Sequence, residues 1–514
     1  MAEVFKFCLR SNVQICKINT AEDQKVLCSI LIKILYSREG GIKMREDNEQ
    51  FTGNESLEDK RSQDKLRTAP ISKLIVSLAV PAIIAQVINA LYNIVDRIYI
   101  SRIPQIGDMA IAGVGVCFPI LILISAFAQL IGVGGSTLAA IELGKRNQKR
   151  AEEMLGNGFV CLIMLSVVLT IVFQFTKHPI LMAFGASQST VGYGLEYLSI
   201  YLFGTIFVET TLGLNQFITC QGKSKIAMLT IFVGAGLNIV LDPVFIFVLD
   251  MGVKGAAVAT VISQAASSIW IIHFLLSKNS NIKIRKEFFP LRKDIVLSIT
   301  ALGVSSFIMS FTECLINVVF NSGLQKYGGD YYVAAMTIIQ SIMQIVYIFS
   351  NGITQGVQPV ISFNYGARQI KRVKSAYRIG FASHITVAVL SSGIIILFPR
   401  FFASLFTENQ TIIGIIIKMM PVFLCGWGIF GIQSGAQCAF VGLGQAKISL
   451  FLACLRKVFL LTSLAIVLPH FIGVNGIFLA EPISDITSAV IAGVLFAVNI
   501  NKILNPVREQ IHMV

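Results

Sequence analysis

Twelve apolar runs of about 20 residues or more divide most of this 514-residue chain, and they constrain its fold more than any other feature. Inside a bilayer every backbone polar group must be satisfied within the protein, so such runs form helices. The runs lie at 74–100, 109–138, 157–176, 192–217, 226–249, 254–276, 295–324, 331–361, 378–399, 412–440, 448–469 and 474–499. The sequence therefore predicts an all-α integral membrane protein with twelve transmembrane helices.

The amount and placement of charge agree with this prediction. Only 14% of the residues are charged, whereas soluble domains carry about 25%, so a soluble, disordered or collagen-like chain is excluded. The net charge of +14 could suit a nucleic-acid partner. However, Lys and Arg gather in the loops after the even-numbered runs, which predicts a multi-pass protein of the cell (plasma or inner) membrane with both termini in the cytoplasm. We expect no nucleic-acid partner.

The two halves of the chain repeat each other. At an offset of 222 residues, Gly134, Gly144 and Arg146 match a second set, Gly356, Gly366 and Arg368. Each half holds six runs, so the halves have the same orientation. Parallel repeats are typical of transporters whose substrate site lies between the halves.

The repeat divides the chain into five segments. Residues 1–70 are polar, and Met44 begins a stretch that leads directly to the first apolar run, so an over-called start at 1–43 stays open. The predicted segments are an N-terminal cytoplasmic extension (1–70), a six-helix lobe (71–277), a cytoplasmic linker (278–294), a second six-helix lobe (295–500) and a cytoplasmic tail (501–514).

Polar side chains in the first lobe fall into two groups. Gln86, Asn89, Asn93 and Asp96 follow one another at spacings of three and four, which places them on one helix face. Polar side chains within a membrane span tend to face the protein interior or a water-filled cavity. Asp96 near the end of its run has an alternative interpretation, a solvated carboxylate paired with Arg97 or Arg102.

The segment NIVLDP (238–243) carries the second group, Asn238 and Asp242, which share a helix face. A lone carboxylate in the membrane must be protonated, ion-bound or paired. We favour a reversible proton or Na⁺ site over a structural carboxylate. Pro81 and Pro243 each free a backbone carbonyl and predict bending of their helices.

The second lobe carries stripes on two runs, 295–324 and 331–361, that plausibly line one cavity. The candidate cavity residues here are Glu313, Asn317, Gln340, Gln344 and Tyr347. Whether Glu313 joins the ion pathway stays open. Arg456, Glu481 and Asp485 lie at comparable depth in the last two runs, and an internal salt-bridge network is favoured over a transport role. Glu209 is a further buried acid to which the sequence assigns no partner.

Motifs for catalysis are missing from the sequence. It contains no Walker A, HExxH, nucleophile elbow or CxxC pattern, and its ten cysteines predict neither a disulfide framework nor a metal site. The sequence therefore predicts no enzyme and no cofactor. A transporter without a nucleotide site must use an ion gradient.

Several segments resemble the multidrug and toxic compound extrusion (MATE) family, in particular its bacterial MepA-like branch. They are PAIIAQVINALYNIVDRIYI (81–100), ELGKRNQKRAEE (142–153), LNIVLDPVFIFVLDMGVKGAAVATVISQ (237–264) and ITQGVQPVISFNYGARQIKRV (353–373). The resemblance covers about residues 66–500. It departs from the family's usual pattern at Ser101, where a glycine is common, and at Thr462-Ser463, where a proline is frequent.

The resemblance implies two six-helix lobes around a central V-shaped cavity, and exchange of inward H⁺ or Na⁺ for outward cationic, amphipathic drugs. Asp96, Asn238 and Asp242 match the family's cation-coupling site. Cavity walls would come from residues including Tyr92, Phe118, Met309 and Tyr347.

We therefore expect a multidrug efflux antiporter that contacts membrane lipid and works as a monomer on small organic cations. One alternative is a lipid-linked precursor flippase of the same wider superfamily, which would need cationic residues in its cavity. A non-transporting scaffold or a channel is the other. The sequence leaves the choice between H⁺ and Na⁺ open.

Overall fold

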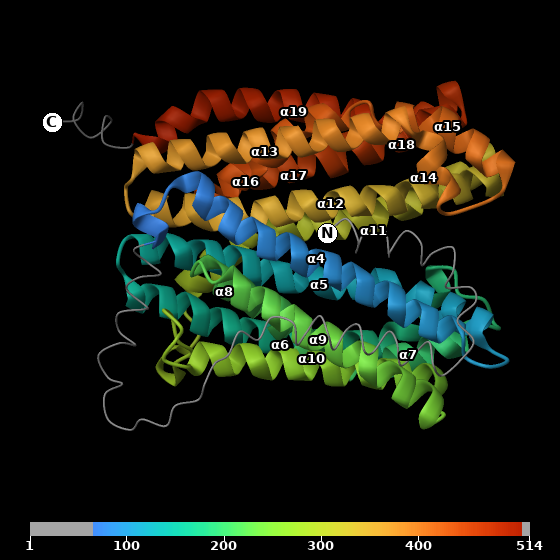
Figure 1. Ribbon diagram of the computed structural model, residues 1–514, viewed down its shortest axis with the longest axis horizontal. Helices are drawn as coiled ribbons and strands as arrows, with labels where there is room; N and C mark the ends of the chain where they lie inside the picture. Colours follow the sequence, from blue (N-terminus) through green and yellow to red (C-terminus); the bar gives the residue numbers. More distant parts are fainter. Residues whose placement is uncertain (1–64, 506–514) are drawn as a thin grey trace.

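The computed structural model describes residues 65–505, and all regular secondary structure in this range is helical (Figure 1). The predicted tail from 506 and the extension up to 64 lie outside the described residues. Large apolar side chains such as Phe175, Leu397 and Phe471 are 74–84% exposed on the helix surfaces. Such a surface suits contact with lipid rather than water.

The N-terminal half forms seven α-helices and short π- and 3₁₀-helical turns. Their bounds are α4 (Ile71–Ser101), α5 (Gly107–Gly144), α6 (Gln148–Ala183), α7 (Val191–Phe203), α8 (Thr205–Cys220), α9 (Ser224–Pro243), the π-helix η2 (Val244–Val248), α10 (Gly252–Leu276) and η3 (Lys286–Phe288). We call α4–α10 the N lobe.

The C-terminal half, α11–α19, is called the C lobe. Its helices are α11 (Lys293–Gly328), α12 (Asp330–Gly366), α13 (Ile370–Leu397), α14 (Pro399–Ser404), α15 (Gln410–Leu424), α16 (Trp427–Gly442), α17 (Ala446–Cys454), the π-helix η4 (Leu455–Thr462), α18 (Ser463–Ile472) and α19 (Val474–Leu504).

Two bent helix pairs complete the set of membrane spans. Within residues 65–505, ten helices are long and apolar enough to cross a membrane, and counting α7–α8 and α15–α16 as one span each gives twelve. The bends are 58° and 45°. They fall at Gly204 and next to Gly426, which are again 222 residues apart (426 − 204). The predicted all-α fold with twelve spans is confirmed, and the repeat extends to the position of the bends.

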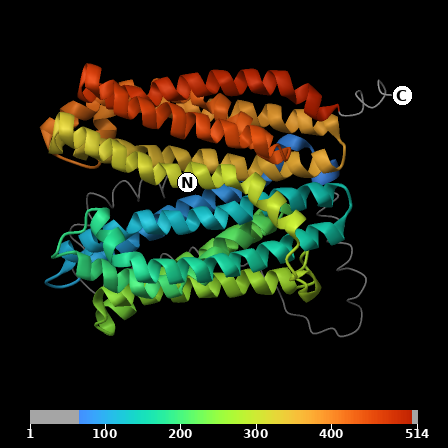
Figure 2. The same ribbon diagram turned by 180° about the vertical axis from the view of Figure 1, so that it is seen from behind.

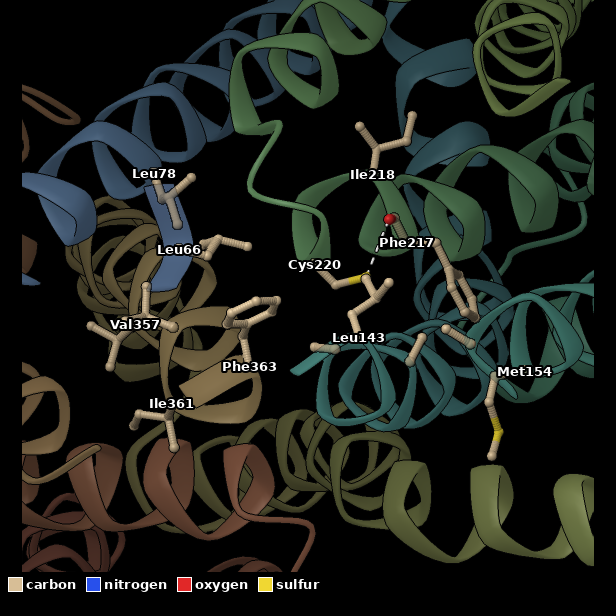
Figure 3. Packing of buried hydrophobic residues seen from close by; sticks show 14 of the residues in the cluster. Leu66, Leu78, Leu143, Met154, Phe217, Ile218, Cys220, Val357, Ile361 and Phe363 are labelled. Atoms are coloured by element: carbon tan, nitrogen blue, oxygen red, sulfur yellow. Dashed lines mark hydrogen bonds between the residues drawn. The ribbon is translucent and has the colours of Figure 1, made fainter. Parts of the chain in front are cut away.

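The two lobes lie side by side as two layers of helices (Figures 1 and 2). At one end a single buried apolar cluster joins them, with Leu143 of α5, Phe217 of α8 and Phe363 of α12 among its members. Figure 3 shows these side chains together with Leu66, which precedes α4. We call this the joined end.

At the opposite end each lobe has its own apolar cluster. The N-lobe cluster includes Ile100 and Tyr197, and the C-lobe cluster includes Phe320 and Phe478. We call this the separated end. The lobes therefore share a core at one end only.

Glycine allows the lobes to come very close at the joined end. A Cβ added to Gly144 of α5 would lie 2.0 Å from the carbonyl oxygen of Phe363, and one added to Gly366 of α12 would lie 1.9 Å from that of Ile141. These contacts are reciprocal, because each pair of residues is related by the 222-residue repeat. No larger residue fits this crossing without separating the helices.

A short segment before α4 fills the joined end. The Leu66 side chain is buried, and its carbonyl oxygen accepts hydrogen bonds from Arg372 Nη2 (3.0 Å) and Asn364 Nδ2 (3.3 Å) of the C lobe. Arg67 Nη2 donates to the carbonyl oxygen of Gly144 at 3.1 Å. This segment thus contacts both lobes.

Candidate functional site

Three N-lobe helices bring four polar side chains together toward the separated end. Asn238 and Asp242 are one turn apart on α9, and Asn238 Nδ2 donates to Asp242 Oδ1 at 3.0 Å. The same amide lies 3.4 Å from Thr260 Oγ1 of α10. The carboxyl of Asp96 on α4 is close enough to interact with that of Asp242. Asp96, Asn238 and Asp242, predicted as one group, lie together, and Thr260 is an addition that the sequence reasoning missed.

These side chains carry buried oxygen atoms that lack partners. Asp96 Oδ1, Asn238 Oδ1 and Asp242 Oδ2 accept no hydrogen bond from any described residue. Two neighbouring carboxylates repel each other, and burial raises the energy of each charge. The arrangement therefore suits a proton or a small hard cation such as Na⁺, which prefers oxygen ligands. It provides no nucleophile and no group poised for catalysis.

Proline changes the helix beside this site. Pro243 ends α9, and the π-helix η2 follows at once. Pro81 lies inside α4 and is buried. Both positions were predicted to bend their helices, and Pro243 stands at a change of helix type directly after Asp242.

The basic residue next to Asp96 is occupied elsewhere. The guanidinium of Arg97 lies over the ring of Phe118 on α5, 4.6 Å from its centroid. Among the described residues Asp96 forms no ion pair with Arg97. Phe118 was expected in the cavity wall and is half-buried here.

The rest of the α4 stripe faces partly open space. Gln86, Asn89, Tyr92 and Asn93 are all half-buried, and Asn93 Nδ2 donates to the carbonyl oxygen of Asn89 at 2.7 Å. Tyr92 interacts electrostatically with both Asp96 and Asp242. The hydroxyl of Tyr92 therefore belongs to the surroundings of the acid pair.

The C-lobe candidates separate into two sets. Met309 and Asn317 on α11 and Gln340 on α12 are half-buried, and Gln344 is exposed. Tyr347 instead packs edge-on against Trp427 of α16, with the ring centroids 4.8 Å apart. Tyr347 therefore belongs to an aromatic and charged cluster inside the C lobe.

That cluster pairs three acids with two bases. Arg456 Nη2 lies 2.9 Å from Glu481 Oε1 and 2.7 Å from Asp485 Oδ1, and its guanidinium lies 4.0 Å from the centroid of the Phe430 ring. Lys457, the next residue, forms an ion pair with Glu313 of α11. Both bases belong to η4 and are buried.

Lys457 corrects the interpretation of Glu313. The sequence reasoning placed Glu313 among the cavity residues without a partner and did not consider Lys457. In the structure the Glu313 side chain is 45% exposed while its cation is buried, so this acid is neutralised from inside the C lobe. Two consecutive basic residues within one apolar run were the signal that could have revealed the pair.

No other described group suggests a metal centre, because within residues 65–505 no three His, Cys, Asp or Glu side chains converge. The acid pair of the N lobe is thus the one buried acidic group at which two carboxyls meet without a base in the described chain.

Known proteins share this architecture. The MatE family model matches residues 81–244 and 305–467, once in each lobe. The multidrug export protein MepA of Staphylococcus haemolyticus (strain JCSC1435) is 24% identical over 376 residues, which cover 73% of this chain and 81% of the relative.

Two solved structures superimpose on most of the fold. A MOP superfamily transporter from Pyrococcus furiosus, described as having a binding pocket of reverse polarity that suggests a different function, has a TM-score of 0.79 and 26% identity over 85% of this chain and 98% of its own. An outward-facing multidrug resistance MATE family transporter has a TM-score of 0.79 and 27% identity over 86% and 98%. Because the family model matches both lobes and more than half of the chain, the protein belongs to the MatE (multidrug and toxic compound extrusion) family of multi-pass membrane transporters.

Proposed function

We propose that this protein is a secondary antiporter, which exports cationic, amphipathic drugs or toxic compounds in exchange for inward H⁺ or Na⁺. One observation carries the proposal: the buried carboxyl groups of Asp96 and Asp242 lie together, with oxygen atoms that no described residue satisfies. Relatives named as multidrug export proteins support the direction of transport. The need to neutralise the acid pair supports coupling to a cation.

The placement of basic residues supports an orientation. Lys145, Arg146, Lys223 and Arg368 lie in loops beside the helix ends that form the joined end. Because such residues are retained in the cytoplasm, we infer that the joined end and both termini face it. The separated end then faces outward, which agrees with the similarity to a solved outward-facing transporter.

Transport would follow from charge balance. In the outward-facing state an external cation or proton reaches Asp96 and Asp242 and neutralises them. The organic cation, held near Tyr92, Met309 and Asn317, loses its electrostatic attraction and leaves. One positive charge that moves inward releases about 2.3 kcal/mol per 100 mV. Because the ion and the drug favour different states, each lowers the affinity for the other.

A flippase for lipid-linked precursors is not supported by the charged side chains. Such a substrate carries a pyrophosphate and needs cationic residues facing it. The buried bases Arg456 and Lys457 are both paired with acids. We therefore infer that the monomer, embedded in lipid, handles organic cations.

The test is efflux of ethidium from proteoliposomes under a proton gradient or a Na⁺ gradient imposed separately. We expect one gradient to drive efflux by the wild type, and Asp242→Asn to abolish it while the protein remains folded and inserted. The matched control is Asp250→Asn, an exposed acid at the outer end of the same span. Efflux by Asp242→Asn at the wild-type rate, or none by the wild type under either gradient, would reject the proposal.

A further inference from the structure

One buried carboxyl of the N lobe is not used by this mechanism. Glu209 on α8 is fully buried, and neither of its oxygen atoms has a hydrogen-bond or ion-pair partner among the described residues. Its neighbour Val208 belongs to the apolar cluster of the separated end, whereas Leu214 belongs to that of the joined end. Glu209 thus lies between the two clusters. A permanently ionised carboxylate would be very costly there.

Two tyrosines connect Glu209 to the acid pair. Tyr201 on α7 interacts electrostatically with both Glu209 and Tyr92. Tyr92 on α4 interacts in turn with Asp96 and Asp242. A phenolic hydroxyl both donates and accepts hydrogen bonds, so it can receive one proton and release another. The polar groups therefore follow one another from the acid pair to Glu209, across three helices.

The surroundings of Glu209 present no competing charge. Helices α5, α6, α9 and α10 pack against α8. Within the described residues none of them places a Lys, Arg, His, Asp or Glu side chain in an ion pair with Glu209, and Tyr201 is the titratable group that interacts with it. A proton is therefore the ligand that the site can accept without further charge compensation.

Polar groups continue from Glu209 toward the joined end. On α8, Thr211 Oγ1 donates to the carbonyl oxygen of Gln264 on α10 at 3.3 Å. Gln264 Oε1 and Asn215 Oδ1 are buried and accept no hydrogen bond from the described residues. These acceptors extend the path by about two helical turns beyond Glu209.

We propose that Glu209 is the inner proton carrier of the transporter, which receives the coupling proton from Asp96 and Asp242 through Tyr92 and Tyr201 and releases it toward the joined end. Each tyrosine gains one proton and loses one, the acid of the pair becomes a carboxylate, and Glu209 becomes a carboxylic acid. This inference rests on the proposed antiport function and narrows its coupling ion to H⁺, since a chain of hydroxyls does not carry Na⁺.

Infrared difference spectroscopy of the purified full chain in lipid nanodiscs, recorded across a pH titration, tests whether Glu209 exchanges a proton. We expect the wild type to show a carbonyl band of a carboxylic acid that disappears as the pH rises, and Glu209→Gln to lack it. The control Glu196→Gln changes an exposed acid of α7 that pairs with Lys254 at 3.5 Å and should keep the band. Identical titrating bands in Glu209→Gln and the wild type would overturn the proposal.

Transport separates a proton-relay role from a structural one. Proton-driven efflux of ethidium by Glu209→Gln should slow by about a hundredfold, the typical contribution of one proton-transfer group. Exchange of labelled for unlabelled ethidium at equal pH needs no net proton movement and should stay unchanged. Tyr201→Phe should show the same split. An equal loss of both activities would overturn the relay.

The outcomes also distinguish this inference from the antiport proposal. Efflux driven by Na⁺ and not by H⁺ would refute the relay and leave antiport intact. A wild type that transports under neither gradient would refute antiport, whereas the infrared band would still decide whether Glu209 exchanges a proton.

Discussion

The glycine crossing at the joined end makes a quantitative prediction. In Gly366→Ala the new Cβ would lie 1.9 Å from the carbonyl oxygen of Ile141, whereas ordinary contact begins at 3.4 Å, so α5 and α12 must separate by about 1.5 Å locally. The obstructing atom belongs to the backbone and cannot rotate away. Overpacking of this kind costs about 1–3 kcal/mol. We expect Gly366→Ala to lower the free energy of unfolding by that amount.

Equilibrium unfolding by SDS in mixed micelles provides the measurement, and Gly115→Ala provides the control. Gly115 lies on α5, and an added Cβ there would meet no atom of the described chain within 4 Å. Gly144→Ala should resemble Gly366→Ala, because its Cβ would meet the same crossing. The double variant should cost less than the sum, since helices already separated by one methyl admit the second more easily.

The reasoning fails if Gly366→Ala and Gly115→Ala unfold with the same free energy to within about 0.5 kcal/mol, the usual range for neutral substitutions. Additive costs in the double variant would show that the two glycines do not share one contact.

Three further predictions concern the clusters around this crossing. Leu66→Ala should lower the free energy of unfolding by about 2–5 kcal/mol, because the leucine is buried in the joined end; the same SDS titration measures it. Arg456→Met should cost about 3–5 kcal/mol by leaving two acids without their base, and replacing those acids by their amides as well should restore most of the loss. Lys457→Met should free the half-exposed Glu313 and tighten binding of a monocationic dye up to about fivefold, which fluorescence anisotropy would detect and added Glu313→Gln would reverse.

The spans and the repeat could be predicted from the sequence because hydropathy and glycine spacing are local signals. The bends at Gly204 and Gly426 could not, since a glycine within a span permits a bend without requiring one. Their positions depend on packing, and a Cβ on Gly426 would lie 2.7 Å from the Cα of Pro482 on a neighbouring helix.

Side-chain partners were predictable only where charge or proline marked them. Asp96 and Asp242 stood out as acids in apolar runs, and they lie together. Thr260 did not stand out, because an uncharged hydroxyl is common in membrane helices. Lys457 was missed because consecutive residues of an α-helix point about 100° apart. In the structure Arg456 and Lys457 lie within the π-helix η4, and both are buried toward acids.

The contrast between the lobes indicates how the work is divided. The C lobe keeps its acids Glu313, Glu481 and Asp485 beside two buried bases. Such pairs hold a fixed charge, because removing a proton from the base or adding one to the acid breaks the pair. The N lobe keeps Asp96, Asp242 and Glu209 without a base, so their charge must change with what they bind. A lobe whose charge can change responds to an ion gradient, and a lobe whose charge is balanced gives it a stable surface to move against.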